Sequence, residues 1–336
     1  MSDARILVVG AGAWGSALAN VFARAGSAVV LWDADSDLVA HIARTGHHPR
    51  CFSDVAFHRG VDARVALDAG DAFDCAVFVV PFQVLVRALA SVREAGVTAA
   101  AVACASKGFE LDTHRMAHEI VAAEWSARAP FAQLSGPNFA TEVMHEAPAA
   151  ITIGASSAAL GELLTGAMHS GRFRPYYTDD VIGVEVGGAL KNVIAIAAGI
   201  ADGLALGSNT RAALITRGLA EIARFGAVRG GRTETFMGLS GMGDLVLTCT
   251  DDQSRNRRFG LALASSGDVD AAAREVGALV EGVATAHAVA EIAAAQDIEM
   301  PIVAAVAAVL AGTISPMAAV ESLLNRDLTA ETESVS

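Results

Sequence analysis

A glycine-rich turn near the N-terminus constrains the fold more than any other feature of the chain. The segment GAGAWG, residues 10–15, follows the apolar run Arg5–Val9 and precedes a helical pattern over Ser16–Arg24. In such a strand–turn–helix the first glycine permits the tight turn, the second lets the backbone approach a pyrophosphate, and the third lets the helix pack on the strand. N–H groups at the helix start attract the anion. The sequence therefore predicts a dinucleotide site at Gly10, Gly12, Ala13, Trp14 and Gly15.

An acidic residue follows at the distance expected for a ribose-binding carboxylate. Asp33 ends the next predicted strand, Val29–Asp33, and should accept hydrogen bonds from the adenosine ribose hydroxyls. Asp35 and Asp37 come next, and no Lys or Arg follows them until Arg44. Because three carboxylates would repel the extra phosphate of NADP, we expect NAD to be preferred, unless a basic side chain arrives from elsewhere in the chain. Asp35 and Asp37 are equally typical of a solvated helix start.

Short apolar runs alternate with helical patterns up to about residue 181. The runs are continuous, as in strands that are buried on both faces of a sheet. Strands separated by helices indicate right-handed βαβ units and a mostly parallel sheet. We therefore expect an α/β fold with an N-terminal Rossmann-type domain over residues 1–183, whose strands are Arg5–Val9, Val29–Asp33, Ala76–Val80, Ala99–Ala103, Ala132–Ser135 and Ala149–Ile153.

The second half of the chain has no further strand pattern. We expect an all-helical substrate and catalytic domain over residues 184–330 and a frayed tail at 331–336. Its longest apolar runs, 193–201 and 302–311, fall short of the roughly 20 residues that a membrane span needs and indicate buried helices. The predicted helices are Val184–Ala201, Arg211–Phe225, Asn256–Ser265, Thr285–Ala295 and Ile302–Ala311.

Composition excludes several function classes. A formal net charge of -13 argues against a nucleic-acid or anionic-membrane partner. The four cysteines are widely spaced and form no CxxC pair, so neither a disulfide framework nor a zinc cluster is expected, and a reducing cytoplasm fits. The N-terminus lacks the pattern of a signal peptide. No spacing typical of metal ligands appears, and we interpret the adjacent pair His47 and His48 as exposed loop histidines.

Lysine is scarce, and Lys107 and Lys191 both lie in informative places. Lys107 follows a predicted strand, where open parallel sheets bind ligands. Lys191 lies in a helix that is apolar nearly all round and so is expected to be buried. Burial would lower the pKa of its ammonium from about 10.4 toward neutrality, which suits proton transfer to a carbinol oxygen. A structural lysine that pairs with Glu185 fits these residues equally well.

A third cluster combines a helix start with arginines. Ser254 is a typical N-cap, and Arg255, Arg257 and Arg258 follow it. A helix N-terminus attracts anions, and an arginine can donate forked hydrogen bonds to a phosphate. In an acidic protein this pattern favours a phosphate site, with Arg255 the strongest candidate; solvated arginines on a capped helix are the alternative, above all for Arg257 and Arg258.

Taken together, these segments resemble the NAD(P)-dependent glycerol-3-phosphate dehydrogenase family. The order and spacing match from about Ile6 to Asn325, and the two most specific segments are GALKNVIAIAAGIADG and QSRNRRFG. Other matching segments are GAGAWGSALA, VPFQVLVRAL, ASKGFELDT, LSGPNFATEV, ALITRGLAEI, GLSGMGDLVLTC and VEGVATA.

The resemblance implies a role for each matching residue. Lys191 matches the proton-transfer lysine, and Lys107 matches a lysine that contacts both substrate and nicotinamide. Asn138 stands where the family has Ser or Thr, and Phe82 stands where it has Ser. The implied substrate contacts are Lys107, Gly136, Asn138, Lys191, Asn192, Asp244, Ser254, Arg255 and Asn256. The implied cofactor contacts, beyond the glycine turn and Asp33, are Phe82, Lys107, Ala140, Arg255, Leu279 and Glu281.

The implied activity is the interconversion of sn-glycerol 3-phosphate and dihydroxyacetone phosphate with NAD or NADP. It would supply glycerol 3-phosphate for glycerophospholipid synthesis, in a cytoplasmic enzyme whose apolar helices suit a homodimer. Two other functions stay open: a lysine-dependent β-hydroxyacid dehydrogenase, which would not need the site at Ser254–Asn256, and a non-catalytic NAD sensor, which would not need a buried Lys191.

Overall fold

A computed structural model of the chain describes residues 4–325, so the expected tail at 331–336 and the end of the predicted second domain, 326–330, lie outside the described residues. The chain divides into two compact units. The first comprises the residues up to Lys107 together with Arg115–Glu185, and the second comprises Gly108–His114 and the residues from Val186 onward. The chain therefore passes between the units three times.

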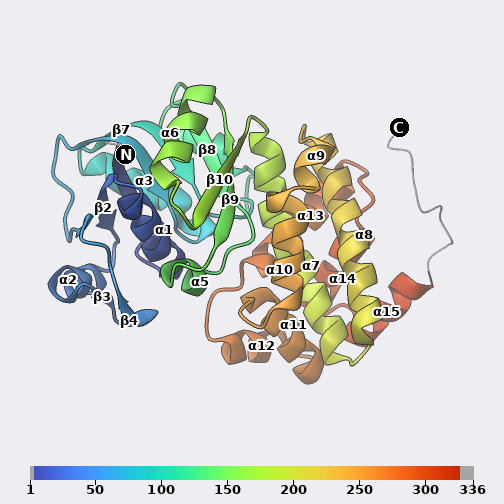
Figure 1. The fold of residues 1–336 in the computed structure, drawn as a ribbon. Coiled ribbons are helices and arrows are strands. Elements are labelled where there is room, and N and C mark those ends of the chain that lie inside the picture. The colour runs from blue at the N-terminus through green and yellow to red at the C-terminus, as the bar shows by residue number, and fades with distance from the viewer. Residues whose placement is uncertain (1–3, 326–336) are drawn as a thin grey trace. The chain divides into compact units, whose positions relative to one another are not determined.

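The first unit is built on one twisted sheet (Figure 1). Eight strands of the described chain form it, in the order β10-β9-β8-β7-β6-β1-β2-β5. Their bounds are β1 Arg5–Val9, β2 Ala28–Trp32, β5 Val61–Ala63, β6 Ala72–Phe78, β7 Thr98–Cys104, β8 Phe131–Ser135, β9 Ala149–Ala155 and β10 Phe173–Thr178. The predicted Rossmann-type sheet is confirmed, and β5 and β10 are additions at its two edges.

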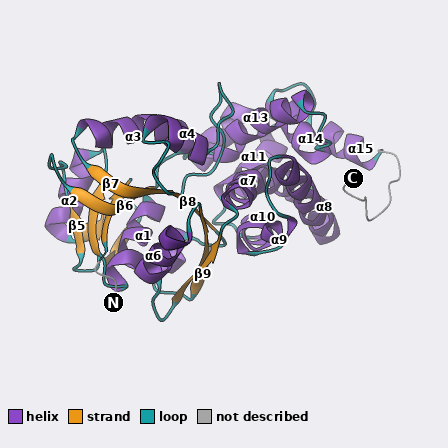
Figure 2. Cartoon of the chain, turned by 90° about the horizontal axis from the view of Figure 1, so that it is seen from above, coloured by secondary structure: helices purple, strands orange, loops and turns teal. Residues whose placement is uncertain are grey.

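Helices cover both faces of this sheet (Figure 2). One apolar cluster joins the strands to α1 Ala13–Arg24, α2 Ser36–Thr45, α5 Ala140–Met144 and α6 Ala158–Met168. The other joins them to η1 Phe82–Val84, α3 Leu85–Glu94 and α4 Ala117–Glu124. Burial on both faces explains why the central strands are apolar at every position.

Two neighbouring strands, β9 and β10, run opposite to the others. β8 and β9 pair antiparallel, whereas the remaining pairs of this sheet are parallel. The connection between them contains only α5, whose five residues span about 7 Å. Such a helix is too short to carry the chain back along a strand about 17 Å long, so the chain turns and pairs antiparallel.

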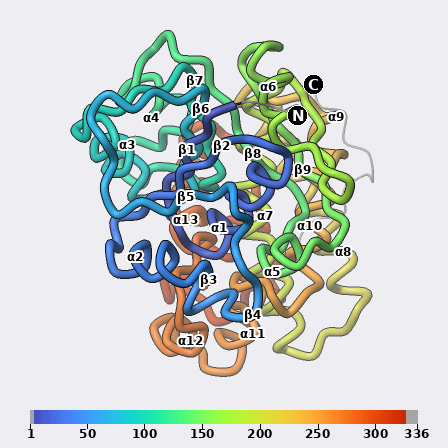
Figure 3. Tube along the Cα trace, turned by 60° about the vertical axis from the view of Figure 1, so that its left-hand side comes forward, coloured from blue at the N-terminus to red at the C-terminus, as the bar shows by residue number. Residues whose placement is uncertain are grey.

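A small hairpin lies outside the main sheet. β3 His47–His48 and β4 Phe52–Ala56 pair antiparallel, and Figure 3 traces them beside α2. The prediction that His47 and His48 are exposed loop histidines is wrong, because both lie in β3, where His47 is half-buried and His48 is 1% exposed. Alternation of polar and apolar residues over only two positions is too short to predict such a strand.

The second unit is helical. Its long helices are α7 Val181–Gly203, which begins in the first unit, and α8 Gly207–Val228. The shorter helices are α9 Thr233–Phe236, a π-helical turn at Leu239–Gly243, α10 Asp244–Thr250, α11 Arg255–Ser266, α12 Val269–Val276, α13 Glu281–Ala295, α14 Pro301–Leu310 and α15 Pro316–Leu324. The predicted helical second half is confirmed.

The helix α7 packs against α8 and α11 within this unit. By length and composition it could cross a membrane, so the expectation that every apolar run is too short needs correction. However, 89% of its apolar window is buried inside the structure, as in the core helix of a globular domain. Two glycines let α11 approach it closely: a Cβ on Gly199 would lie 2.1 Å from the Arg257 carbonyl oxygen, and one on Gly260 would lie 2.2 Å from that of Ile196.

Candidate functional site

The glycine-rich turn has the geometry that a dinucleotide requires. Gly10 follows β1 with a φ of +110°, where a Cβ would lie 2.4 Å from the Val79 carbonyl oxygen. A Cβ on Gly15 would lie 1.9 Å from the Gly10 carbonyl oxygen, so α1 packs closely against the turn. A Cβ on Gly12 would meet nothing within 4 Å, so the helix start faces open space that a pyrophosphate fits. Ala13 and Trp14 follow Gly12 in the first turn of α1, which begins three residues earlier than predicted.

The carboxylate of Asp33 lies beside this turn. It follows β2 and accepts a hydrogen bond from the Ala11 backbone N–H at 2.6 Å and one from the Asp35 N–H at 2.8 Å. Asp35 caps α2, as a solvated helix start would, and its carboxylate pairs with Arg50 at 3.0 Å. The bond to Leu38 and the charge of Arg50 hold the pKa of Asp35 below its usual value. A basic side chain therefore does reach the acidic segment, from the tip of the hairpin rather than from Arg44.

The predicted residues of the first unit gather at one edge of the sheet. Gly10, Phe82, Lys107 and Gly136 follow β1, β6, β7 and β8, which are neighbouring parallel strands. The carboxyl ends of parallel strands form the ligand-binding edge of such sheets. The side chain of Phe82 does not face this edge, because it is 4% exposed and packs in the apolar core beneath α3. Ala140 begins α5 and packs against the opposite core.

Asn138 has a free acceptor at this edge. Its side-chain N–H donates to the Ala150 carbonyl oxygen at 2.7 Å, while its Oδ1 is buried and has no partner among the described residues. A buried oxygen without a hydrogen bond is costly, so this oxygen is able to accept one from a donor that the described residues do not supply. Gly136, with a φ of +142°, lies against the backbone of β9, where a Cβ would be 3.3 Å from Ala150.

The second unit holds a buried lysine cluster. Lys191 of α7 is 9% exposed, and its Nζ pairs with the Asp244 carboxylate and donates to Thr248 Oγ1 at 2.9 Å. Thr248 in turn donates to the Asp244 carbonyl oxygen at 2.6 Å. The alternative pairing with Glu185 does not occur, because that carboxylate binds the backbone and ring of His118. A buried ammonium needs a charge partner, and Asp244 supplies it.

Two asparagines link this cluster to neighbouring helices. The side-chain N–H of Asn256 donates to Asn192 Oδ1 at 2.9 Å, and its Oδ1 accepts from the Gly282 backbone N–H at 3.0 Å. Gly282 lies in the first turn of α13, where a Cβ would lie 2.7 Å from Asn256 Oδ1. Since both groups of the Asn256 amide are occupied within the protein, its side chain orients Asn192. Leu279, 55% exposed, and Glu281 lie beside this helix start.

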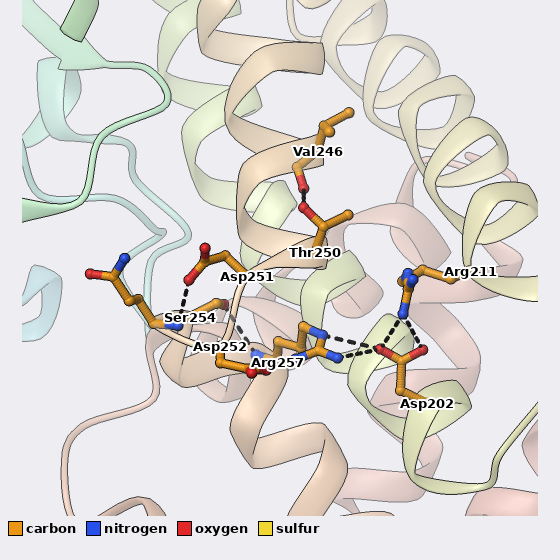
Figure 4. Close-up of polar contacts among 9 residues, drawn as sticks. Asp202, Arg211, Val246, Thr250, Asp251, Asp252, Ser254 and Arg257 are labelled. Carbon is orange, nitrogen blue, oxygen red and sulfur yellow. Dashed lines mark hydrogen bonds and ion pairs between the residues drawn. The ribbon is translucent and has the colours of Figure 1, made fainter. Parts of the chain in front are cut away.

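The N-terminus of α11 is capped and carries arginines in two environments. Ser254 Oγ accepts from the Arg257 N–H at 3.2 Å, and the side chain of Arg255 is exposed. Arg257 is not solvated: it is 9% exposed and bound to Asp202, which also binds Arg211 at 2.8 Å (Figure 4). Arg258 is exposed. Arg255 and Arg258 are both exposed, and Arg255 is the one at the N-terminus of α11, whereas Arg257 holds α11 to the end of α7.

Sequence reasoning missed Thr248, His48 and Gly282. Thr248 follows Asp244 by four residues on α10, so both face the same side of that helix, and this spacing could have indicated it. The contacts of His48 and Gly282 depend on long-range packing, for which the sequence has no local signal.

Comparison with known proteins agrees with this geometry. The family model described as NAD-dependent glycerol-3-phosphate dehydrogenase N-terminus matches residues 5–160, and the corresponding C-terminus model matches residues 180–321. The chain is 46% identical to glycerol-3-phosphate dehydrogenase [NAD(P)+] of Xanthomonas euvesicatoria, over 96% of this chain and 95% of the relative. It is 47% identical to the enzyme of the same name from Burkholderia lata, over 97% of this chain and 100% of the relative.

A solved structure shows the same fold. Glycerol-3-phosphate dehydrogenase from Coxiella burnetii superposes with a TM-score of 0.90 at 41% identity, covering 96% of this chain and 99% of that one. Two family models and these relatives account for almost all of the described residues. The chain belongs to the NAD-dependent glycerol-3-phosphate dehydrogenase family.

Proposed function

We propose that this protein interconverts sn-glycerol 3-phosphate and dihydroxyacetone phosphate with NAD(P)(H). The relatives carry this activity in their names, and the observation that carries it for this chain is the buried Lys191 held by Asp244 and Thr248. Supply of glycerol 3-phosphate to lipid synthesis is consistent with the activity. A cytoplasmic homodimer with functional domains at residues 1–183 and 184–330 remains our expectation for the whole enzyme.

The proton transfer is assigned to Lys191. When bound, the nicotinamide gives or takes a hydride at the C2 carbon of the substrate. In the reducing direction the Lys191 ammonium donates a proton to the C2 oxygen, and in the other direction the amine takes it back. Asp244 holds the ammonium in the buried site, and the positive charges of Lys191 and Lys107 stabilise the negative charge that develops on the oxygen.

The remaining contacts hold the substrate. Arg255 and the backbone at Ser254–Asn256 bind the phosphate, since a helix N-terminus favours an anion and the guanidinium donates charge-assisted hydrogen bonds. Asn192, oriented by Asn256, presents its amide to the substrate. The unpartnered Oδ1 of Asn138 accepts a hydrogen bond from a substrate hydroxyl. The amide thereby replaces the substrate contact that the Ser or Thr of the family makes.

The first experiment follows oxidation of NADH and NADPH with dihydroxyacetone phosphate as the substrate. We expect turnover with both and a higher kcat/KM with NADH, because the Asp33 carboxylate beside the glycine-rich turn should repel the extra phosphate of NADPH. Arg50 neutralises Asp35 and works against this preference. A higher kcat/KM with NADPH would contradict the NAD preference without affecting the proposed reaction.

Lys191→Ala tests the catalytic assignment. Loss of the proton donor should lower kcat by about 10² to 10⁴-fold, with little change in the Kd for NADH. If kcat stays within a few-fold of wild type, Lys191 is not the proton donor.

Arg255→Ala tests the phosphate site. Loss of a charge-assisted contact should lower kcat/KM for dihydroxyacetone phosphate by about tenfold to a hundredfold. Arg258→Ala is the matched control, because Arg258 is an exposed arginine on the same helix. A β-hydroxyacid dehydrogenase would instead prefer an unphosphorylated hydroxyacid and would be insensitive to Arg255→Ala.

A further inference from the structure

The tip of the β3–β4 hairpin wraps around the buried ring of His48. The Nδ1 of this ring accepts hydrogen bonds from the backbone N–H groups of Arg50 and Cys51, each at 3.1 Å. A nitrogen that accepts two N–H groups carries no proton, so the proton of the neutral ring lies on Nε2. Burial lowers the pKa of His48, which agrees with a neutral ring at pH 7. The edge of the ring also contacts Phe52, with the ring centroids 6.0 Å apart.

The other nitrogen of the ring reaches the glycine-rich turn. Nε2 lies 3.0 Å from the Ala11 carbonyl oxygen, and with its proton assigned it is the donor. The Ala11 N–H donates to Asp33, as described above, and the Ser16 hydroxyl donates to the same Ala11 carbonyl at 3.2 Å. Ala11 lies between Gly10 and Gly12, two residues whose backbone has wide conformational freedom. Both polar groups of this central residue are thus fixed by side chains from other parts of the first unit.

We propose that His48 is a positioning residue for the dinucleotide, which holds the Ala11 carbonyl so that the N–H groups of the first turn of α1 face the pyrophosphate. This inference rests on the proposed function only in its use of NAD(P)(H). It makes the hairpin, which no motif in the sequence marks, a part of the cofactor site. Without this bond the turn is held by Asp33 and Ser16 and samples other backbone conformations, so cofactor binding has to order it.

His48→Phe is the informative variant, because it keeps an aromatic ring of similar size against Phe52 and removes all three hydrogen bonds of the ring. We expect the Kd for NADH, measured by fluorescence titration, to rise about tenfold, as for the loss of one buried hydrogen bond, with kcat at saturating NADH within twofold of wild type. His48→Gln, which retains a side-chain N–H of similar reach, should restore most of the affinity. His47→Phe is the matched control on the same strand, and we expect it to bind NADH like wild type.

Amide hydrogen exchange of the cofactor-free protein separates positioning from general loss of stability. In His48→Phe, exchange should be faster in the Gly10–Gly15 turn than in wild type, while the strands of the sheet keep their protection. An unchanged Kd for NADH in His48→Phe, or faster exchange throughout the first unit, would overturn the proposal. Failure of the wild-type protein to bind NADH would instead defeat the proposed function.

A measurement on the wild-type protein keeps the proposal testable if His48→Phe does not fold. Nitrogen NMR of the histidine rings distinguishes the two neutral tautomers. We expect His48 to carry its proton on Nε2 at pH 7; a proton on Nδ1 would leave Nε2 unable to donate to Ala11 and would overturn the proposal.

Discussion

Thr248 contacts both Lys191 and Asp244 in the buried lysine cluster. Its hydroxyl accepts from Lys191 Nζ and donates to the Asp244 backbone, so it fixes the direction from which the ammonium faces its carboxylate. The hydroxyl cannot become charged, and its contribution is therefore to geometry. Geometry of this kind matters because a proton donor works only within hydrogen-bond reach of the reacting oxygen.

We expect Thr248→Val to lower kcat by about tenfold, since the side chain keeps its shape but loses the hydrogen bond to Lys191. The KM for NADH should stay close to that of wild type. Thr250→Val on the same helix is the control: Thr250 makes an equivalent bond to the Val246 carbonyl oxygen, at 2.8 Å, and its side chain is exposed (Figure 4). Equal effects of the two substitutions in steady-state kinetics would argue against a role for Thr248.

The helices α7 and α11 approach each other closely at two glycines, and this contact fixes the position of α7, which carries Lys191, within the second unit. Backbone carbonyl oxygens occupy the places where the Cβ atoms of Gly199 and Gly260 would lie. Backbone cannot move aside as a side chain can, so an added methyl group has to push the two helices apart. Arg257, which binds Asp202 at the end of α7, reinforces the same crossing.

Gly199→Ala should destabilise the protein by about 1–3 kcal/mol, as overpacking of a core does, and lower kcat because α7 carries Lys191. Gly166→Ala in α6 is the control, since a Cβ there meets nothing within 4 Å and the residue is exposed. Alanine at that position should be neutral or stabilise by up to about 1 kcal/mol. Chemical denaturation measures both, and a neutral Gly199→Ala would show that the crossing can relax.

Elements with a strong local signal could be predicted from the sequence, and those that depend on distant contacts could not. The continuous apolar strands and the long helices α7 and α8 lie where they were expected, within a few residues. The antiparallel β9 depends on the shortness of α5, and the hairpin depends on His48 reaching Ala11. In the same way the apolar pattern of α7 predicts that Lys191 is buried, whereas Asp244 follows only from the family resemblance, and the contact with Thr248 depends on how α10 packs on α7.

At the scale of the whole molecule, the chain links its two units more than once. The segment Gly108–His114 belongs to the second unit although residues of the first unit flank it on both sides, and α7 continues without a break from one unit into the other. His114 of this segment pairs with Glu291 of α13 at 3.1 Å. The two units are therefore joined covalently at three places along the chain.

We expect a single cooperative unfolding transition in scanning calorimetry, which NADH shifts to higher temperature as one peak. At a concentration of 100 times its Kd, NADH should stabilise the folded state by about 2.7 kcal/mol. Lys191→Ala should show the same shift, because the lysine is not part of the glycine turn. Two separate peaks, of which NADH moves only one, would contradict this coupling.

Because residues 108–114 belong to the second unit, they also affect how chimeras between this enzyme and its relatives have to be made. A chimera made with one junction near residue 185 would join this short segment of one parent to the helical bundle of the other. The ring of Phe109 packs edge-on against Phe225 of α8. In the chimera these two positions would come from different parents. A working chimera would need to take residues 108–114 and the residues from Val186 onward from the same parent. The exchanged part is therefore two separate segments of the sequence.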